Sequence, residues 1–225
     1  MEPSMTTQSP ARVINQGVVM TGAPTVFVVD DNPGVRSSLH RLMQSEGLAV
    51  ETYASADEFL AAFDPARPGC LLLDVRLRGA SGLDLQDELR RRKALLPIIV
   101  ITGYANVPTS VRALKSGAAD FLRKPVNPEA LLERVRAAID HDRAARATAA
   151  ESAAIEHRLQ RLTLRERQVT KLLAEGKTSK EIAVLLNVST RTVEGHRNMV
   201  LSKMEASTAA QLAGLIMRVG DAVRT

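Results

Sequence analysis

The sequence has one cysteine, no tryptophan and few other aromatic residues, and its apolar runs are short. A single cysteine excludes an internal disulfide framework. Cys70 lies in the apolar run 70–73, which predicts a buried structural thiol rather than a nucleophile or a metal ligand. No apolar stretch approaches the roughly 20 residues that span a bilayer, and the first residues lack the basic-then-apolar order of a signal peptide. We therefore expect a cytoplasmic protein without a membrane segment.

Positive charge is concentrated in the C-terminal third of the chain. From His157 to the end there are 12 Lys or Arg and 6 Asp or Glu, whereas residues 1–156 contain 18 and 19. A basic small domain joined to a near-neutral larger one is typical of a nucleic-acid reader attached to a control module. An ordinary solvated basic surface is the alternative that charge alone leaves open. The length of 225 residues favours two small domains.

The N-terminal two thirds have the pattern of repeated βα units. Residues 1–23 are rich in Ser, Thr, Pro and Gly and are expected to form a mobile tail. The unit over 24–143 then alternates short apolar runs with longer stretches of helical period, which indicates an α/β fold with a parallel sheet. The predicted strands are 26–29, 48–52, 70–73, 98–101 and 119–122. The predicted helices are 34–46, 56–63, 82–93, 107–116 and 128–141.

The C-terminal part is predicted to be entirely helical. From residue 127 to about 162 the sequence contains no Gly and only the Pro at the helix start, so residues 144–157 are expected to form a helical linker, with a flexible linker as the alternative. Residues 158–225 then form an all-α domain of four helices. Thr163 with Glu166, and Thr178 with Glu181, match the capping box that starts a helix, and Ser189 can cap a third helix. A fourth helix is expected near 208–219.

Polar residues follow four of the five predicted strands. Asp30 and Asp31 follow the first, Asp74 the third, Thr102 the fourth, and Lys124 comes shortly after the fifth. In a doubly wound parallel sheet these residues meet outside the carboxyl ends of the strands. Three carboxylates in one cleft repel each other unless a cation is present, and their oxygen atoms suit Mg²⁺ or Mn²⁺.

This pocket could carry phosphoryl transfer. Asp74 follows the central buried run and can attack a phosphoryl donor, while Lys124 neutralises charge and Thr102 donates a hydrogen bond. Each residue alone is weak evidence, because a strand-end Asp more often forms a turn and a Lys is more often a solvated charge. The combination carries the prediction.

The runs Val-Val-Asp30-Asp31, Leu-Leu-Leu-Asp74, Ile-Thr102-Gly and Lys124-Pro125 resemble the receiver domain of two-component response regulators. The resemblance implies a flavodoxin-like, five-stranded sheet of order 2-1-3-4-5 and phosphorylation of Asp74 by a sensor histidine kinase. It also implies a magnesium site completed by the backbone carbonyl of Arg76, and a cis peptide before Pro125. Phe121 takes the switch-aromatic position, with ordinary core packing as its alternative. The dimer surface that phosphorylation is expected to pair includes Val111, Lys115, Asp120 and Arg123.

The C-terminal blocks at 162–169, 176–183 and 188–197 resemble the LuxR-type helix-turn-helix, and together with the receiver they indicate a FixJ/NarL-type regulator. The helix after Ser189 is then expected to enter the major groove of promoter DNA. The residues expected on that face are Arg191, Thr192, Glu194, Gly195, Arg197 and Asn198, with Glu194, Gly195 and Asn198 nearest the base edges. The expected backbone contacts are Lys177, Thr178, His196 and Lys203, and Ser189 is also expected to contact the DNA. The resemblance also implies a homodimer on phosphorylation and activation of transcription, with RNA polymerase as a further partner.

Three alternatives compete with this hypothesis. Phosphohydrolases also use a strand-end Asp beside Mg²⁺, but they need a second Asp two residues later, where this chain has Arg76. A phosphate-independent dimerisation module would not need the complete set of pocket residues. A pure protein-interaction adaptor leaves the basic C-terminal motif unexplained. We therefore predict a transcription regulator rather than a metabolic enzyme.

Overall fold

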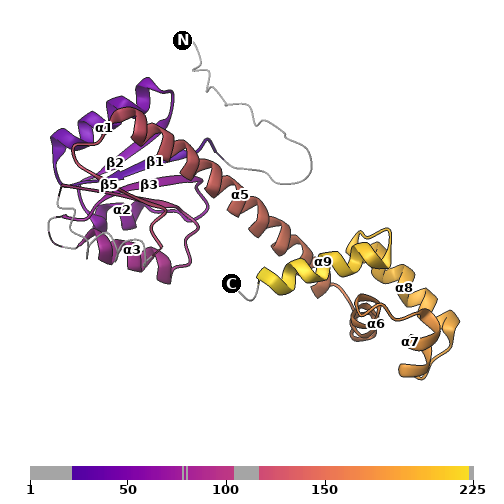
Figure 1. Cartoon of the computed structure of the whole chain (residues 1–225). Helices are drawn as coiled ribbons and strands as arrows, with labels where there is room; N and C mark the ends of the chain where they lie inside the picture. The colour runs from indigo at the N-terminus through magenta and orange to yellow at the C-terminus, as the bar shows by residue number, and fades with distance from the viewer. Residues whose placement is uncertain (1–21, 78, 80, 104–116, 223–225) are drawn as a thin grey trace, which may run out of the picture. The chain divides into compact units, whose positions relative to one another are not determined.

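The computed structural model describes residues 22–77, 79, 81–103 and 117–222 (Figure 1). The chain divides into two compact units, residues 1–146 and 147–225, and each is described by itself. Most of the predicted tail and the predicted helix at 107–116 lie outside the described residues. Within the described ranges, no helix combines the length and the apolar character needed to cross a bilayer.

The first unit is built on a five-stranded parallel sheet of order β2-β1-β3-β4-β5, which confirms the predicted fold. Its strands are β1 (Thr25–Val29), β2 (Ala49–Tyr53), β3 (Gly69–Asp74), β4 (Ile98–Thr102) and β5 (Asp120–Arg123). Among the described residues, the helices that pack against the sheet are α1 (Pro33–Ser45), α2 (Ala56–Ala62), α3 (Gly82–Arg91) and the first part of α5 (Pro128–Gln160).

The sheet lies between layers of helices (Figure 1), and an apolar core fills the space on each of its faces. Because side chains alternate along a strand, Val26 and Val28 of β1 pack in the core shared with α1 and α5. Phe27 and Val29 pack in the core on the other face, with α2 and α3. Cys70 is fully buried, and burial raises the pKa of its thiol to about 12, as befits a structural residue.

A buried ion pair ties α5 to the start of β3. The Asp142 carboxylate is almost fully buried, and it accepts hydrogen bonds from the Gly69 backbone N–H at 2.9 Å and from Arg146 Nε at 2.8 Å. The Arg146 guanidinium also donates to the backbone carbonyls of Pro65 and Arg67, each at 2.8 Å. The part of α5 up to Arg146 is therefore bound to the loop that precedes β3.

The helix α5 is continuous through the predicted linker, so the helical alternative for this segment is correct and the flexible one is wrong. The second unit contains α6 (Leu164–Ala174), α7 (Ser179–Leu185), α8 (Thr190–Met204) and α9 (Ala209–Ala222), the four helices expected. Both predicted capping boxes, at Thr163 with Glu166 and at Thr178 with Glu181, are present. These helices and the last turns of α5 enclose one core that includes Ile155, Ile182 and Val193.

Candidate functional sites

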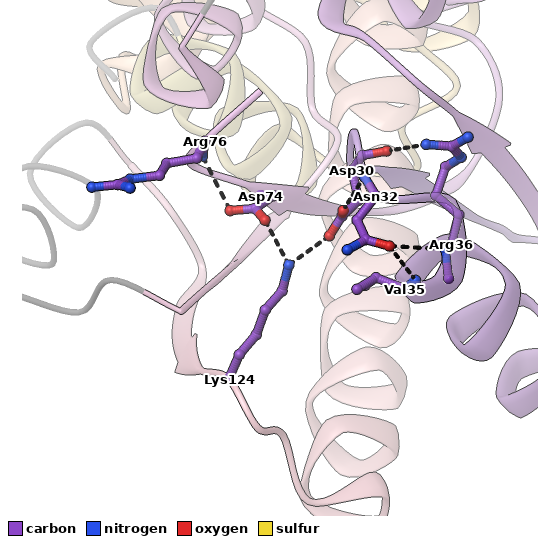
Figure 2. Close-up of polar contacts among 8 residues, drawn as sticks. Asp30, Asn32, Val35, Arg36, Asp74, Arg76 and Lys124 are labelled. Atoms are coloured by element: carbon purple, nitrogen blue, oxygen red, sulfur yellow. Dashed lines mark hydrogen bonds and ion pairs between the residues drawn. The ribbon is translucent and has the colours of Figure 1, made fainter. Parts of the chain in front are cut away.

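The predicted pocket residues lie at the carboxyl ends of neighbouring strands. The strand β3 pairs with β1 on one side and with β4 on the other, so Asp30, Asp74 and Thr102 come together at one edge of the sheet. Lys124 follows β5 and reaches toward the same place (Figure 2). The order of the sheet reverses between β1 and β3, which is where ligands bind in doubly wound folds.

The Lys124 ammonium bridges two carboxylates. Its Nζ lies 2.6 Å from Oδ2 of Asp30 and 2.5 Å from Oδ2 of Asp74 (Figure 2). The side chains of Asp30 and Asp74 are only 3% and 11% exposed. Burial lowers the pKa of Lys124, but the hydrogen bonds and charges of the two carboxylates outweigh it, so the pKa is raised overall. Lys124 is therefore held as a cation, and a single positive charge lies between two negative ones.

Backbone donors fix the other oxygen of each carboxylate. The Asn32 N–H donates to Oδ1 of Asp30 at 2.9 Å, and the Arg76 N–H donates to Oδ1 of Asp74 at 3.1 Å (Figure 2). Arg36 adds a hydrogen bond from Nη1 to the backbone carbonyl of Asp30 at 2.6 Å. Both carboxylates are thus oriented before any ligand binds.

Sequence reasoning missed Asn32 and Arg36. The Asn32 side chain caps α1 by accepting the N–H groups of Gly34 and Val35 at 2.9 and 3.3 Å. The signal was present, because Asn directly before a Pro at the first helical position is a strong helix start. Arg36 lies in the first turn of α1 and contacts the carbonyl of Asp30, which directly follows β1. No local sequence pattern predicts this contact.

A hollow of about 370 Å³ opens at this edge of the sheet. Its lining includes Asp31, Asp74, Arg76, Thr102 and Lys124. The structure thus brings the predicted polar residues Asp30, Asp31, Asp74, Thr102 and Lys124 to one place, where Asp30 and Asp74 share the lysine. Within the part of the chain that the structure describes, no three carboxylate, imidazole or thiolate side chains stand in an arrangement that could hold a metal ion.

Gly82 lies against the backbone of Asp74. A Cβ atom at this first residue of α3 would stand 2.1 Å from the Asp74 carbonyl oxygen and 3.1 Å from the Cα of Val75. The Gly82 N–H donates to the Val75 carbonyl at 2.9 Å. The start of α3 therefore packs directly on the chain that carries the aspartate.

The remaining residues predicted for the receiver lie around β5. Phe121 is partly buried and packs against the core on the side of α2 and α3. The peptide bond between Lys124 and Pro125 is cis. Asp120 forms an ion pair with Arg134 of α5, and Arg123 is exposed. Val111 and Lys115, which complete the predicted dimer surface, lie outside the described residues.

The helix α8 presents one polar face to solvent. Val193, Val200 and Met204 are buried and attach the helix to the domain core. The exposed residues of its first three turns include Arg191, Thr192, Glu194, Gly195 and Asn198. His196 and Arg197 are partly exposed. The residues predicted to read DNA therefore share the side of α8 that faces away from the core.

Three of the residues predicted to contact DNA have structural partners inside the domain. The Lys203 ammonium lies 2.7 Å from the Glu166 carboxylate, so it joins the end of α8 to the start of α6. Thr178 and Ser189 cap α7 and α8 by accepting the N–H groups of Glu181 and Thr192. The ion pair with Glu166 and the low exposure of the Lys203 side chain, about a quarter, both argue against the phosphate contact expected from the sequence.

Other cations of the second unit are also engaged internally. Arg158 pairs with Glu205, and Arg165 and Arg167 donate to the backbone carbonyls of Leu186 and Leu162. Among the described residues, four cations on or beside α7 and α8 have side chains without a hydrogen bond or ion pair inside the chain. They are Lys177, Lys180, Arg191 and Arg197. Lys180 is exposed on α7 and was missed by sequence reasoning, because one Lys in a short helix has no distinguishing pattern.

Comparison with known proteins identifies the family of each part of the chain. Residues 26–136 match the response regulator receiver domain, and residues 160–216 match the bacterial regulatory proteins of the luxR family. Transcriptional regulatory protein FixJ of Azorhizobium caulinodans is 43% identical over 199 residues, which cover 88% of this chain and 93% of that protein. Nodulation protein W of Bradyrhizobium diazoefficiens is 42% identical, with 87% of this chain and 86% of that protein covered.

Solved structures give the same result. The response regulator StyR superposes with a TM-score of 0.80 at 37% identity, covering 88% of this chain and 100% of that one. Full-length FixJ from B. japonicum gives a TM-score of 0.55 at 35% identity and covers 89% of this chain and 99% of that one. The chain therefore belongs to the two-component response regulators of the FixJ/NarL type. It is a DNA-binding transcriptional regulator that works with a kinase and promoter DNA, not a metabolic enzyme.

Proposed function

We propose that Asp74 is the residue that accepts phosphate and that the exposed face of α8 then reads promoter DNA. The observation that carries the first half is the Lys124 ammonium, which is held between Asp30 and Asp74 at the switch point of the sheet. A fixed cation beside a nearly buried carboxylate suits a reaction that adds a phosphoryl group to that carboxylate.

The reaction follows from these positions. An oxygen of Asp74 forms a bond to the phosphorus atom of a phosphohistidine on the sensor kinase, while the P–N bond breaks and the leaving imidazole takes up a proton. Lys124 offsets negative charge on the phosphoryl oxygens, and the Thr102 hydroxyl donates a hydrogen bond to one of them. The same pocket then supports slow loss of the phosphate to water. We propose that Thr102 moves toward the phosphoryl group after transfer. Phe121, which packs partly in the core beside this edge, then rotates inward.

The donor chemistry of the pocket fits Mg²⁺ or Mn²⁺. Asp30, Asp31, Asp74 and the carbonyl of Arg76 would hold the ion once the carboxylates turn toward it from their present positions, in which Asp30 and Asp74 bind Lys124 and no three of the described side chains form a metal site. When bound, the cation supplies additional positive charge at the phosphoryl oxygens. Asp30 and Asp74 already approach one ammonium, which supports their reaching a common cation.

For the DNA-binding half, the exposed cations and polar groups of α7 and α8 support our assignment. We propose that Glu194, Gly195 and Asn198 approach base edges, since Asn can read adenine and Glu can accept from cytosine. Lys177, Lys180, Arg191 and Arg197 hold backbone phosphates, with the caps Thr178 and Ser189 beside them. Thr192 and His196 flank this face. We withdraw Lys203 from it because of its ion pair with Glu166.

We further propose that phosphorylation pairs two copies through the surface that includes Asp120 and Arg123. A dimer would place two copies of α8 on two half-sites of one operator. The expected outcome is activation of transcription, with RNA polymerase as the protein contacted at the promoter. Sedimentation with and without a small-molecule phosphodonor tests the dimer, and an unchanged mass would contradict it.

One experiment tests both halves of the main proposal. The full chain is treated with a small-molecule phosphodonor and Mg²⁺, analysed for phosphate uptake by mass spectrometry, and used to select DNA from a random library. We expect one phosphate on Asp74 and enrichment of a two-fold-symmetric site, with neither result for Asp74→Asn. Asp57→Asn, which changes an exposed aspartate of α2, is the matched control and should behave as wild type.

Two outcomes would overturn the proposal. Phosphate found on Asp74→Asn at the wild-type level would show that another residue is the acceptor. Selection of the same site by treated and untreated wild type, with equal affinity, would show that phosphorylation does not control DNA binding.

A further inference from the structure

A glycine lies in the middle of the exposed face of α8. Gly195 is the sixth residue of a helix that runs from Thr190 to Met204. A glycine in a helix interior destabilises the helix by roughly 0.5–1 kcal/mol relative to alanine. A helix that must be rigid to read DNA therefore carries a residue that weakens it.

None of the ordinary reasons for a helical glycine applies to Gly195. Its backbone does not take the left-handed conformation found at glycines such as Gly176. A Cβ atom at this position would meet no atom within 4 Å, so no neighbour in the chain requires the small residue. The position is also remote from both ends of the helix, where glycine could serve as a cap. The fold of the domain thus accepts a side chain here and does not explain its absence.

The neighbours of Gly195 on the helix surface determine the chemical character of the space that the missing side chain leaves open. Arg191 and Met199 lie one turn away on either side, and Asn198 lies three residues later, so all three are neighbours on the helix surface. Met199 is 52% exposed, although it is a large apolar side chain beside polar ones. The missing side chain therefore leaves bare backbone beside the apolar Met199 on the polar face, and we call this gap in the row of side chains the notch.

We infer that Gly195 is a specificity-determining residue whose notch admits the 5-methyl group of a thymine, with the Met199 side chain packed against that methyl. This inference rests on the proposed function, in which this face of α8 lies in the major groove. Among the groups displayed in that groove, the thymine methyl is the apolar one, so it is the group that an apolar notch selects. The charged and amide groups beside the notch, Glu194 and Asn198, would read the adjoining base pairs.

The test uses the operator obtained by selection with the phosphodonor-treated full chain. Each thymine of a half-site is replaced in turn by deoxyuracil, which removes only the methyl group, and affinity is measured for wild type and for Gly195→Ala. We expect wild type to lose about fourfold in affinity at one thymine per half-site, the amount that burial of one methyl group is worth. Gly195→Ala should bind the thymine operator more weakly and should not distinguish thymine from deoxyuracil at that position.

A matched control comes from α9. Gly214 is also an exposed helical glycine, and a Cβ atom there would meet no atom within 4 Å, so Gly214→Ala adds the same group on another helix. Both variants should slow amide hydrogen exchange in their own helix, because alanine favours helix, and this excludes unfolding as the cause of weaker binding. Gly214→Ala should keep the wild-type preference for thymine.

The outcomes separate this inference from the function on which it rests. If wild type binds its operator but no deoxyuracil substitution weakens it, or if Gly195→Ala keeps the thymine preference, the notch does not read a methyl group and the inference is wrong. If the treated chain selects no DNA, the proposed reading of DNA by α8 fails and the inference fails with it.

Discussion

The two units hold their charges in opposite ways. In the pocket of the first unit, the functional charges are paired with each other, because Lys124 is bound by Asp30 and Asp74. In the second unit, the paired cations are structural, as with Lys203 and Glu166, whereas described cations on or beside α7 and α8, such as Arg191, have no hydrogen-bond or ion-pair partner in the chain. In the proposed phosphoryl-binding pocket the charges are neutralised before the ligand binds, whereas on the proposed DNA-binding surface the described positive charges are left without partners.

This difference has a physical basis. A nearly buried carboxylate without a compensating charge is costly, so the pocket needs a cation before phosphate arrives. An exposed arginine is solvated by water and costs little alone. Its full electrostatic contribution is realised only when it displaces the counterions of DNA.

The largest effect is expected from removing the cation of the pocket. Lys124→Met nearly keeps the length of the side chain but leaves Asp30 and Asp74 without their shared ammonium. We expect phosphate uptake from a small-molecule donor to slow by about 10²- to 10³-fold, the usual loss when a preorganised electrostatic contact to a reacting centre is removed. Time-resolved mass spectrometry of the full chain measures this rate.

Arg90→Met is the control for Lys124→Met, because it removes an exposed cation of α3 and should leave the rate unchanged. If Lys124→Met took up phosphate at a rate close to that of wild type, the charges of the pocket would not have the function that the comparison of the two units gives them. The paired charges of the pocket would then serve folding rather than phosphate transfer.

The next effect is expected at the structural ion pair of the first unit. Arg146→Ala leaves the buried Asp142 carboxylate without its guanidinium, which should cost about 3 kcal/mol. Arg143→Ala removes a solvent-exposed partner of Asp140 on the same helix and should cost less than about 0.5 kcal/mol. Hydrogen exchange of the Ala66, Arg67 and Gly69 amides measures the difference. Equal protection in the two variants would contradict the role given to the buried pair.

A smaller loss is expected at the structural ion pair of the second unit. Glu166→Gln keeps an acceptor for the Thr163 N–H but removes the charge that binds Lys203, and we expect about 1–3 kcal/mol of destabilisation. Glu181→Gln makes the same change in the capping box of α7, where no lysine bridges the carboxylate to another helix, and should be nearly neutral. Hydrogen exchange of the amides of α6 and α8 reports on the second unit alone.

The pH dependence of this unit has a definite sign. The Lys203 ammonium, followed by the Thr163 N–H, holds the pKa of Glu166 below its ordinary value of 4.5. The ionised carboxylate therefore contributes its full stability above pH 4.5. This contribution falls as the pH drops below that value and is gone below the folded-state pKa. Glu166→Gln should lack the acid sensitivity of α6 and α8 that wild type shows, and equal sensitivity would assign it to another group.

The smallest effect is expected from a single unpaired cation. Arg197→Ala should weaken binding to all DNA sequences alike and lower the salt dependence, as the slope of log K against log salt, by about 0.9. Lys203→Ala should leave that slope unchanged while it destabilises α8. The opposite result, with Lys203 controlling the slope, would restore the contact expected from the sequence and remove the contrast between the two units.

Much of the fold could be predicted because local patterns and topology agree. Apolar runs identified the three central strands closely, since these strands are buried on both faces. The edge strands β2 and β5 were placed one residue early, because a half-exposed strand has a weaker apolar boundary. Both capping boxes of the second unit were found, since their residues interact within one turn.

The contacts that were missed join residues far apart in the sequence. Lys203 was expected on DNA from the resemblance to the LuxR-type helix-turn-helix, but its partner Glu166 lies 37 residues earlier. Asp142 and Arg146 have the spacing of an ordinary surface pair, and only the loop before β3 makes the pair buried. In the pocket, the five polar residues were predicted to meet. The ion pairs of Lys124 with both Asp30 and Asp74 were not predicted, because they depend on the backbone conformation of the segment after β5.

The close approach of Gly82 to the chain at Asp74 has a consequence for tolerance to mutation. No side chain at position 82 fits without moving the backbone of Asp74 or the start of α3. A random screen for signalling-dead variants should therefore recover substitutions at this position alongside those of the charged residues. Even Gly82→Ala, which adds a single methyl group, would displace the backbone of Asp74 while every polar side chain of the pocket remained present.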